Sequence, residues 1–252
     1  MAGHNKWSKI KRKKGATDAK RSKEFSRILK EITIAVREGQ SGDPDFNPRL
    51  RTALINAKGF NLPKENIERA ISKALDTSQE SMYEPTYEGY GPGGVAIFVE
   101  CATDNLNRTI SSVRAVFNKK GGNLSTSGSV DFLFDRKGIF ILPIGEQDPE
   151  ALELELIDAN AQEMEFDAES KELTVVVNFE DFGLMQKKLE ALGLEATSST
   201  LERIPQNTIT LDLDTARSVM NLLDALEEDD DVSQVFHNLE LTDELASSMV
   251  AE

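Results

Sequence analysis

The chain of 252 residues has one cysteine, two histidines and no long apolar run. A single cysteine excludes an intramolecular disulfide. Because Cys101 lies in an apolar run with Val95, Ile97 and Val99, we expect a buried thiol in a reducing compartment. No stretch approaches the roughly 18 apolar residues of a membrane helix, and no apolar segment follows the basic N-terminus as in a secretory signal. We therefore expect a cytoplasmic protein without a membrane partner.

The sequence also lacks the side chains of common catalytic and metal sites. His4 and His237 are the only histidines, so no histidine-based catalytic pair or metal cluster is indicated. The phosphate-binding motif G-x-x-x-x-G-K-[ST] is absent, and the glycine-containing stretch Gly121 to Ser129 has no lysine. We expect a protein that is not an enzyme and that needs no cofactor and no metal.

Positive charge is scarce in most of the chain but dense at its start. The net charge is −15, yet the first thirty residues carry eleven lysines or arginines against Asp18 and Glu24. Residues 1–80 have a balance of +8 and residues 81–252 a balance of −23. A basic segment of this density is typical of chains that neutralise phosphates, and the Trp7 indole can stack on bases. A merely solvated basic tail is the alternative, but it leaves Trp7 without a partner.

The charge pattern predicts a nucleic-acid-binding arm over residues 1–21. The candidate binding residues are His4, Lys6, Trp7, Lys9, Lys11, Arg12, Lys13, Lys14, Lys20, Arg21 and Lys23. DNA and ribosomal RNA both fit such an arm as partners. An acidic adaptor that binds only proteins is a third hypothesis.

Apolar periodicity predicts three amphipathic helices after the arm. The first carries its apolar stripe from Phe25 to Ala35 and ends near Gly39, and the others follow Pro48 and Pro63. Because each helix has one apolar face, the three should close into a bundle within residues 22–80.

The third helix invites a helix-turn-helix interpretation. Its expected exposed face includes Glu65 and Glu68, which phosphates in a major groove would repel. The sequence therefore favours contacts from the arm over base readout by this helix.

From Gly94 onward strands and helices alternate. The expected strands are 95–101, 130–134, 139–142, 163–166, 173–178, 195–203, 208–213 and 232–236. The expected helices are 108–119, 149–160, 182–192 and 215–227, with a turn at 135–138. These are two βαββαβ sets, either consecutive or with one inserted into the other, and periodicity does not choose between them.

Two loops and an acidic run are further candidates. A candidate anion or interface site comprises Tyr87, Tyr90, Asn105, Asn107 and Arg108, because a helix N-terminus beside an arginine attracts anions. The asparagines are equally good helix caps and the glycine-rich segment an ordinary turn. The acidic residues 227–231 are either a solvated turn or a surface that repels nucleic acid.

Five segments of the chain resemble one known family. They read GHNKWSKIKRKKGATDAKRSKEF, GDPDFNPRLRTAL, NLPKENIERAI, YEGYGPGGVAIFVECATDNLNRT and FNKKGGNLSTSGSV. They are similar to the YebC family, with small departures at Asn5 and Ser125. Its members are described as DNA-binding transcriptional regulators and include the mitochondrial translational activator of cytochrome c oxidase. Bacterial members are also placed on ribosomes stalled at proline-rich stretches.

The resemblance implies an α+β protein with a three-helix bundle and two split-βαβ (ferredoxin-like) domains, one nested in the other. The expected division is an arm at 1–21, a bundle at 22–80, a discontinuous domain at 81–134 and 206–240, an inserted domain at 135–205 and a tail at 241–252. The implied function is a DNA-binding regulator of gene expression, and the alternative is a ribosome-associated translation factor. Oligomeric state does not follow from the sequence.

Overall fold

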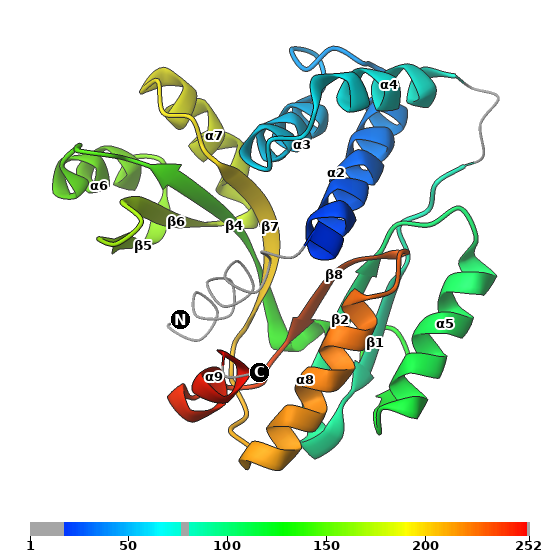
Figure 1. The fold of residues 1–252 in the computed structure, drawn as a ribbon. Helices are drawn as coiled ribbons and strands as arrows, with labels where there is room; N and C mark the ends of the chain where they lie inside the picture. The colour runs from blue at the N-terminus through cyan, green and yellow to red at the C-terminus, as the bar shows by residue number, and fades with distance from the viewer. Residues whose placement is uncertain (1–17, 77–80, 251–252) are drawn as a thin grey trace. The chain divides into compact units, whose positions relative to one another are not determined.

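A computed structural model describes residues 18–76 and 81–250. The chain divides into two compact units, which we call unit 1 and unit 2. Unit 1 comprises residues 1–27, 80–135 and 204–252, and unit 2 comprises residues 28–79 and 136–203. The five-segment division expected from the sequence stays a prediction. The expected class is confirmed, because the described chain combines helices with two four-stranded antiparallel sheets (Figure 1).

Three helices follow the N-terminal segment, as the periodicity predicts. They are α2 (Asp18–Gly39), α3 (Pro48–Gly59) and α4 (Lys64–Leu75). The helix α2 begins in unit 1 and continues into unit 2. Asn47 is buried between α2 and α3. It accepts a hydrogen bond from the Leu50 N–H at 3.0 Å and donates to the Ala35 carbonyl at 2.8 Å. The Asn47 side chain thus caps α3 and fixes the loop of glycines and prolines that connects α2 to α3.

The helix α4 presents the charged face that the sequence predicts. Glu65 and Glu68 are both exposed. The apolar stripe of this helix runs to its last residue, Leu75, which is half exposed rather than buried.

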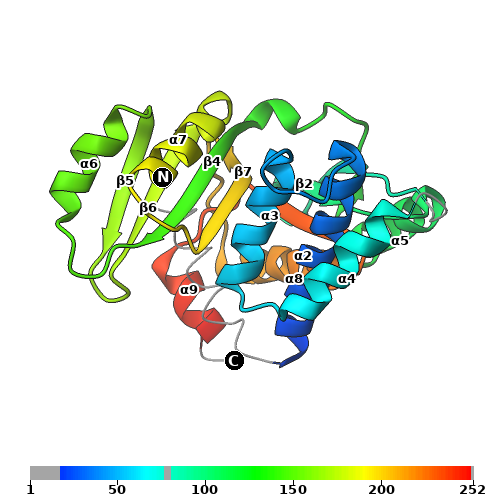
Figure 2. The same ribbon diagram turned by 90° about the horizontal axis from the view of Figure 1, so that it is seen from above.

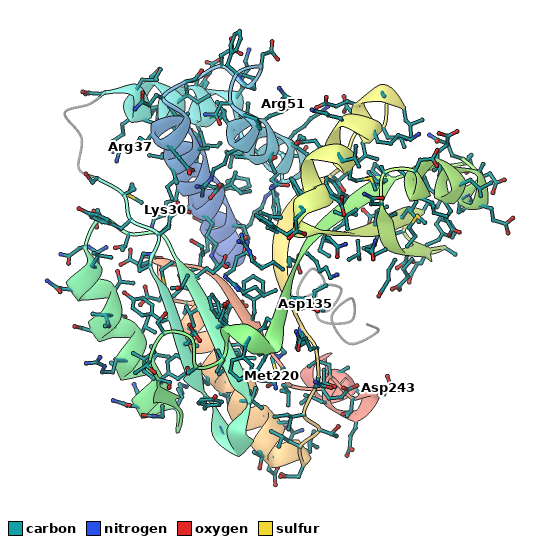
Figure 3. All side chains as sticks on the ribbon, turned by 180° about the vertical axis from the view of Figure 1, so that it is seen from behind. Lys30, Arg37, Arg51, Asp135, Met220 and Asp243 are labelled. Atoms are coloured by element: carbon teal, nitrogen blue, oxygen red, sulfur yellow. The ribbon has the colours of Figure 1, made fainter. Side chains whose placement is uncertain are left out.

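The sheet of unit 1 has the order β3-β1-β2-β8. Its strands are β1 (Thr86–Tyr90), β2 (Ala96–Cys101), β3 (Asn123–Leu124) and β8 (Val232–His237). The helices α5 (Leu106–Lys119) and α8 (Leu213–Glu227) cover one face, as Figure 1 shows, and enclose a core that includes Ile97, Phe117 and Leu222. Met220 of α8, marked in Figure 3, belongs to the same core. The other face carries a smaller cluster around Phe98 and Phe134.

The sheet of unit 2 has the order β5-β6-β4-β7, which Figure 2 shows side by side. Its strands are β4 (Phe134–Pro143), β5 (Ala161–Asp167), β6 (Glu172–Asn178) and β7 (Ser198–Pro205). The helices α6 (Pro149–Ile157) and α7 (Phe182–Ala191) pack on one face around Phe140, Val175 and Met185. This is one complete βαββαβ set lying between β3 and β8 in the chain. The nested arrangement is therefore confirmed, and the consecutive one is wrong.

The strands predicted from the sequence around residue 135 have the wrong bounds. The expected strand 130–134 is a 3₁₀ turn at Asp131–Leu133 that leads into β4, and the expected turn at 135–138 is part of β4. Gly138 pairs with Val177 in the ladder, and a Cβ there would lie 2.6 Å from the Phe182 ring. This glycine permits a close approach inside a strand rather than a turn.

Three further expectations need correction. The segment around Tyr87, expected as a loop, is strand β1. The expected strand at 208–213 is reduced to a single bridge between Ile209 and Leu239, and α8 begins at Leu213. The segment expected as a tail contains α9 (Asp243–Val250), with Leu245 buried in the unit 1 core. The apolar residues in these segments are too few and too close together to show a helical or strand periodicity.

None of the helices in the described ranges 18–76 and 81–250 is long and apolar enough to cross a membrane.

Candidate functional site

The candidate nucleic-acid-binding residues lie mostly outside the described part of the chain. His4, Lys6, Trp7, Lys9, Lys11, Arg12, Lys13 and Lys14 precede Asp18, where α2 begins. Lys20 is on α2, and only Arg21 and Lys23 of the set have described side chains. Their role in binding stays a prediction.

Within unit 1, the first turns of α2 are attached to the end of α8. Lys23 donates a hydrogen bond to the Glu228 carbonyl and lies 4.0 Å from the Asp230 carboxylate. Arg27 donates to the carbonyls of Glu227 at 2.7 Å and Val232 at 3.2 Å. The Glu227 and Glu228 carbonyls lie at the C-terminus of α8, where cations are favoured because the last C=O groups lack helical partners, and the Val232 carbonyl lies at the start of β8.

Arg21 differs from these two cations because its side chain is exposed. Its guanidinium carbon lies 5.5 Å from the centre of the Phe25 ring. Of the two candidate residues whose side chains are described, Arg21 has its charge exposed to solvent, while Lys23 contacts α8.

The contrast between Arg21 and Arg27 gives a paired prediction. We expect Arg27→Ala to lower the free energy of unfolding by about 2 kcal/mol, since it removes charge-assisted hydrogen bonds from a side chain that is only 12% exposed. Arg21→Ala should change stability by less than about 0.5 kcal/mol and weaken nucleic-acid binding instead. Urea unfolding and binding titrations of both variants check this. Equal stability losses would contradict the anchoring role of Arg27.

The acidic run 227–231 is not simply a solvated turn. Asp231 is buried, and its carboxylate accepts hydrogen bonds from the Arg108 guanidinium at 2.8 to 3.0 Å and from the Thr109 hydroxyl at 2.9 Å. Asp229 accepts from the Ser112 hydroxyl. The run therefore connects the end of α8 to α5, which explains acidic residues at a helix C-terminus that the macrodipole alone disfavours.

The structure brings Asn105 and Arg108 together at the start of α5. The Asn105 side chain caps the helix by accepting from the Arg108 N–H at 3.1 Å, and Asn107 is exposed in the first turn of α5. The Arg108 guanidinium contacts both Asp231 and Asp104, which raise its pKa. Two carboxylates around one guanidinium leave a local excess of negative charge, so this position does not favour an anion.

Tyr87 and Tyr90 lie on β1 rather than in a binding loop. Tyr87 packs against the unit 1 core, and burial, followed by the nearby Cys101 and Asp231, raises the pKa of its phenol. The Tyr90 hydroxyl donates to the Ser129 carbonyl at 2.9 Å. Both tyrosines thus have structural contacts, and neither lies with Asn105 and Arg108 in the shallow polar pocket of about 400 Å³ beside Tyr83.

Sequence reasoning missed a buried carboxylate on β1. Glu88 is 3% exposed and accepts hydrogen bonds from the backbone N–H groups of Gly128 at 2.6 Å, Val130 at 2.7 Å and Asp131 at 3.0 Å. It therefore fixes the segment that joins β3 to β4. Carboxylates are abundant in this chain, and because the segment was expected as a loop, no signal in the sequence distinguished Glu88 from the exposed ones.

The fold and the charge distribution together define the class of protein. One split-βαβ unit is inserted into a second sheet-containing unit, a helical segment precedes both, and the N-terminal segment is strongly basic. Across the described residues, no group of histidine, cysteine or acidic side chains is arranged to hold a metal ion.

The comparisons identify the family. The model of the TACO1/YebC N-terminal domain matches residues 5–77, and that of the TACO1/YebC second and third domains matches residues 82–239. The chain belongs to the TACO1/YebC family.

Proteins with similar sequences match this chain over almost its whole length. A protein of Amoebophilus asiaticus called a probable transcriptional regulatory protein is 51% identical over 95% of this chain and 98% of its own length. One of Citrifermentans bemidjiense with the same name is 45% identical over 99% and 100%. The crystal structure of a conserved hypothetical protein from Aquifex aeolicus matches with a TM-score of 0.79 and 43% identity, covering 90% of this chain and 93% of that one.

Proposed function

We propose that this protein is a non-enzymatic regulator of gene expression that binds nucleic acid through its basic N-terminal segment. The observation that carries the proposal is the charge distribution: eleven of the 29 lysines and arginines lie in the first thirty residues of a chain whose net charge is −15. The names of the relatives, probable transcriptional regulatory protein, support the same role.

The described structure supports the N-terminal segment over α4 as the binding surface. The exposed face of α4 carries two glutamates, and its Lys64 lies 3.5 Å from Glu68. Anchoring of α2 by Lys23 and Arg27 gives the preceding basic segment a fixed point of attachment on unit 1. In this proposal, unit 1 holds the basic segment in place through α2, and the positive charge of that segment provides the affinity for nucleic acid.

DNA is the target that the relatives' names favour, and ribosomal RNA is the alternative. Both are polyanions, so charge alone does not separate them. The Trp7 indole can distinguish the two targets, because an aromatic ring stacks on unpaired bases and a duplex has few of them.

The experiment measures binding of the full chain to a DNA duplex and to a looped RNA over a range of salt. Neutralising six to eight phosphates should give a slope of log K against log[salt] of roughly −4 to −7. Lys11→Ala should reduce that slope by about one unit on either target. A slope near zero on both targets would contradict the proposal.

Trp7→Ala in the same assay selects between the targets. For a protein that works on RNA, the substitution should cost about 1–3 kcal/mol on looped RNA, leave the salt slope nearly unchanged and cost much less on the duplex. Equal losses on the two targets, or none on either, would favour DNA.

A further inference from the structure

The helix α6 of unit 2 has apolar side chains on two opposite faces. Its leucines stand at every second position, Leu152, Leu154 and Leu156, and such positions point about 200° apart around a helix. Leu156 is fully buried and Leu152 packs against the unit 2 core, so one face is covered. Leu154 and Ile157 lie on the other side and are 72% and 54% exposed. Because a helix that is apolar all round is normally covered all round, the second face suits a contact with another polypeptide.

Two glutamates stand beside this exposed apolar pair. Leu154 and Ile157 are three residues apart and are therefore neighbours on the helix surface. Glu150 and Glu153 precede them by four residues each, which places each glutamate one turn away on the same side. Neither glutamate forms an ion pair with a residue in the described ranges. We call these four residues the outer face of α6.

The chain around the outer face of α6 is strongly acidic. From Glu146 to Glu169 it has ten aspartates or glutamates and no lysine or arginine. This stretch contains α6 and the edge strand β5, which Figure 2 shows next to each other within unit 2. Complementary charge favours encounter and selects the partner of an interface. The outer face of α6 therefore fits a basic polypeptide that also carries apolar side chains.

The chain itself contains a segment with this chemistry. Between Lys6 and Lys14 it has six lysines or arginines and no acidic residue, with Trp7 and Ile10 among them. Tryptophan is one of the side chains that contribute most to binding at the centre of protein interfaces. The segment thus combines the positive charge and the two apolar side chains that the outer face of α6 fits.

We propose that residues 6–14 of one copy bind the outer face of α6 on a second copy. Trp7 and Ile10 pack on Leu154 and Ile157, and the surrounding cations pair with the acidic side chains. Exposed ion pairs contribute little singly, so the apolar contact and the charges are both needed. The interface is small, and we expect a dissociation constant on the order of 10–100 μM at low salt.

The same basic segment is proposed above to bind nucleic acid. Self-association is measured with no nucleic acid present, so either proposal can fail while the other stands.

Fluorescence of Trp7 in the full chain tests the proposal, because it is the single tryptophan of the sequence. At about 0.05 M salt, its emission should shift to shorter wavelength as the protein concentration rises from about 1 to about 300 μM. Sedimentation equilibrium over the same range should show a rising average mass. Raising the salt to about 0.5 M should weaken the association at least about fivefold, since salt screens the ion pairs.

One pair of leucine variants tests the apolar contact. Leu154→Ser should weaken the association at least about tenfold. Leu184→Ser on α7 is the matched control, because it removes another exposed leucine of unit 2, and it should leave the association unchanged. Both variants should melt at the temperature of the wild type, since both side chains are exposed.

A pair of double variants tests the charges. Glu150→Gln with Glu153→Gln should weaken the association by about three- to tenfold. Glu65→Gln with Glu68→Gln on α4 removes the same charge from another exposed surface and should leave the association unchanged. The proposal would be overturned by a constant average mass up to 300 μM or by equal effects of test and control variants. A Trp7 shift that is independent of protein concentration would also overturn it, because the contact would then lie within one chain.

Discussion

A chain lacking residues 2–17 is expected to lose at least about 100-fold in affinity for nucleic acid at about 0.1 M salt. The deletion removes six lysines and arginines together with Trp7, whereas the whole of α2 from Asp18 remains. Each neutralised phosphate releases a counterion, so the loss should shrink as salt rises. Fluorescence anisotropy with labelled duplex and looped RNA measures both effects.

The deletion should leave the fold unchanged. Lys23 and Arg27 still reach the end of α8, and the buried residues of α2 begin at Ile28. Circular dichroism and the melting temperature should match those of the full chain. A matched control replaces six exposed cations elsewhere by glutamine: Lys64, Arg69, Lys73, Lys119, Lys120 and Lys187. If that control lost as much affinity as the deletion, binding would follow overall charge rather than the N-terminal segment.

Replacement of Glu88 by alanine should give the largest loss of stability among single substitutions in unit 1 that we consider. The carboxylate accepts three backbone hydrogen bonds, of which the one from Val130 is buried. Removing it leaves those N–H groups without their partner, at a cost of about 3 kcal/mol. Glu88→Gln keeps the shape but loses the charge, so we expect roughly half of that cost.

Urea unfolding monitored by far-ultraviolet circular dichroism measures these losses of stability. Glu163→Ala on β5 is the control, because it removes an exposed strand glutamate and should change stability by less than about 0.5 kcal/mol. A Glu88→Ala protein as stable as this control would show that the segment joining β3 to β4 does not depend on the carboxylate.

The helices were the elements that the sequence predicted best. Gly39 ends α2, Pro48 begins α3, and α8 lies within two residues of its expected bounds. These signals are local, since a proline fixes its own φ and a glycine ends a helix without help from distant residues. Periodicity over ten or more residues adds to them.

Strands that contain glycine were predicted poorly, because a glycine can mark either a turn or a close approach within a strand. Gly89 lies within β1, where a Cβ would come 2.7 Å from the Phe117 ring. Gly138 lies within β4 for the same reason, with Phe182 as its neighbour. In both places the glycine makes room for an aromatic ring from a distant part of the chain, which a local pattern does not contain.

Individual carboxylates were the least predictable part of the candidate site. Asp231 and Glu88 are buried and hydrogen-bonded, whereas Asp230, next to Asp231 in the chain, is exposed. All three are acidic residues in an acidic chain. Their roles depend on Arg108 and on the backbone of residues 128–131, which only the tertiary fold brings close.

Photochemical crosslinking of the full chain to nucleic acid in cells, followed by mass spectrometry of the crosslinked peptides and sequencing of the attached strands, tests the central claim most directly. If the N-terminal segment binds nucleic acid, the crosslinked peptides should come from residues 1–23, with Trp7 and the surrounding lysines as the principal positions. The sequenced strands then identify the target as genomic DNA or ribosomal RNA. Crosslinks concentrated on α4 or within residues 81–252, or no crosslinked nucleic acid at all, would contradict binding through the N-terminal segment.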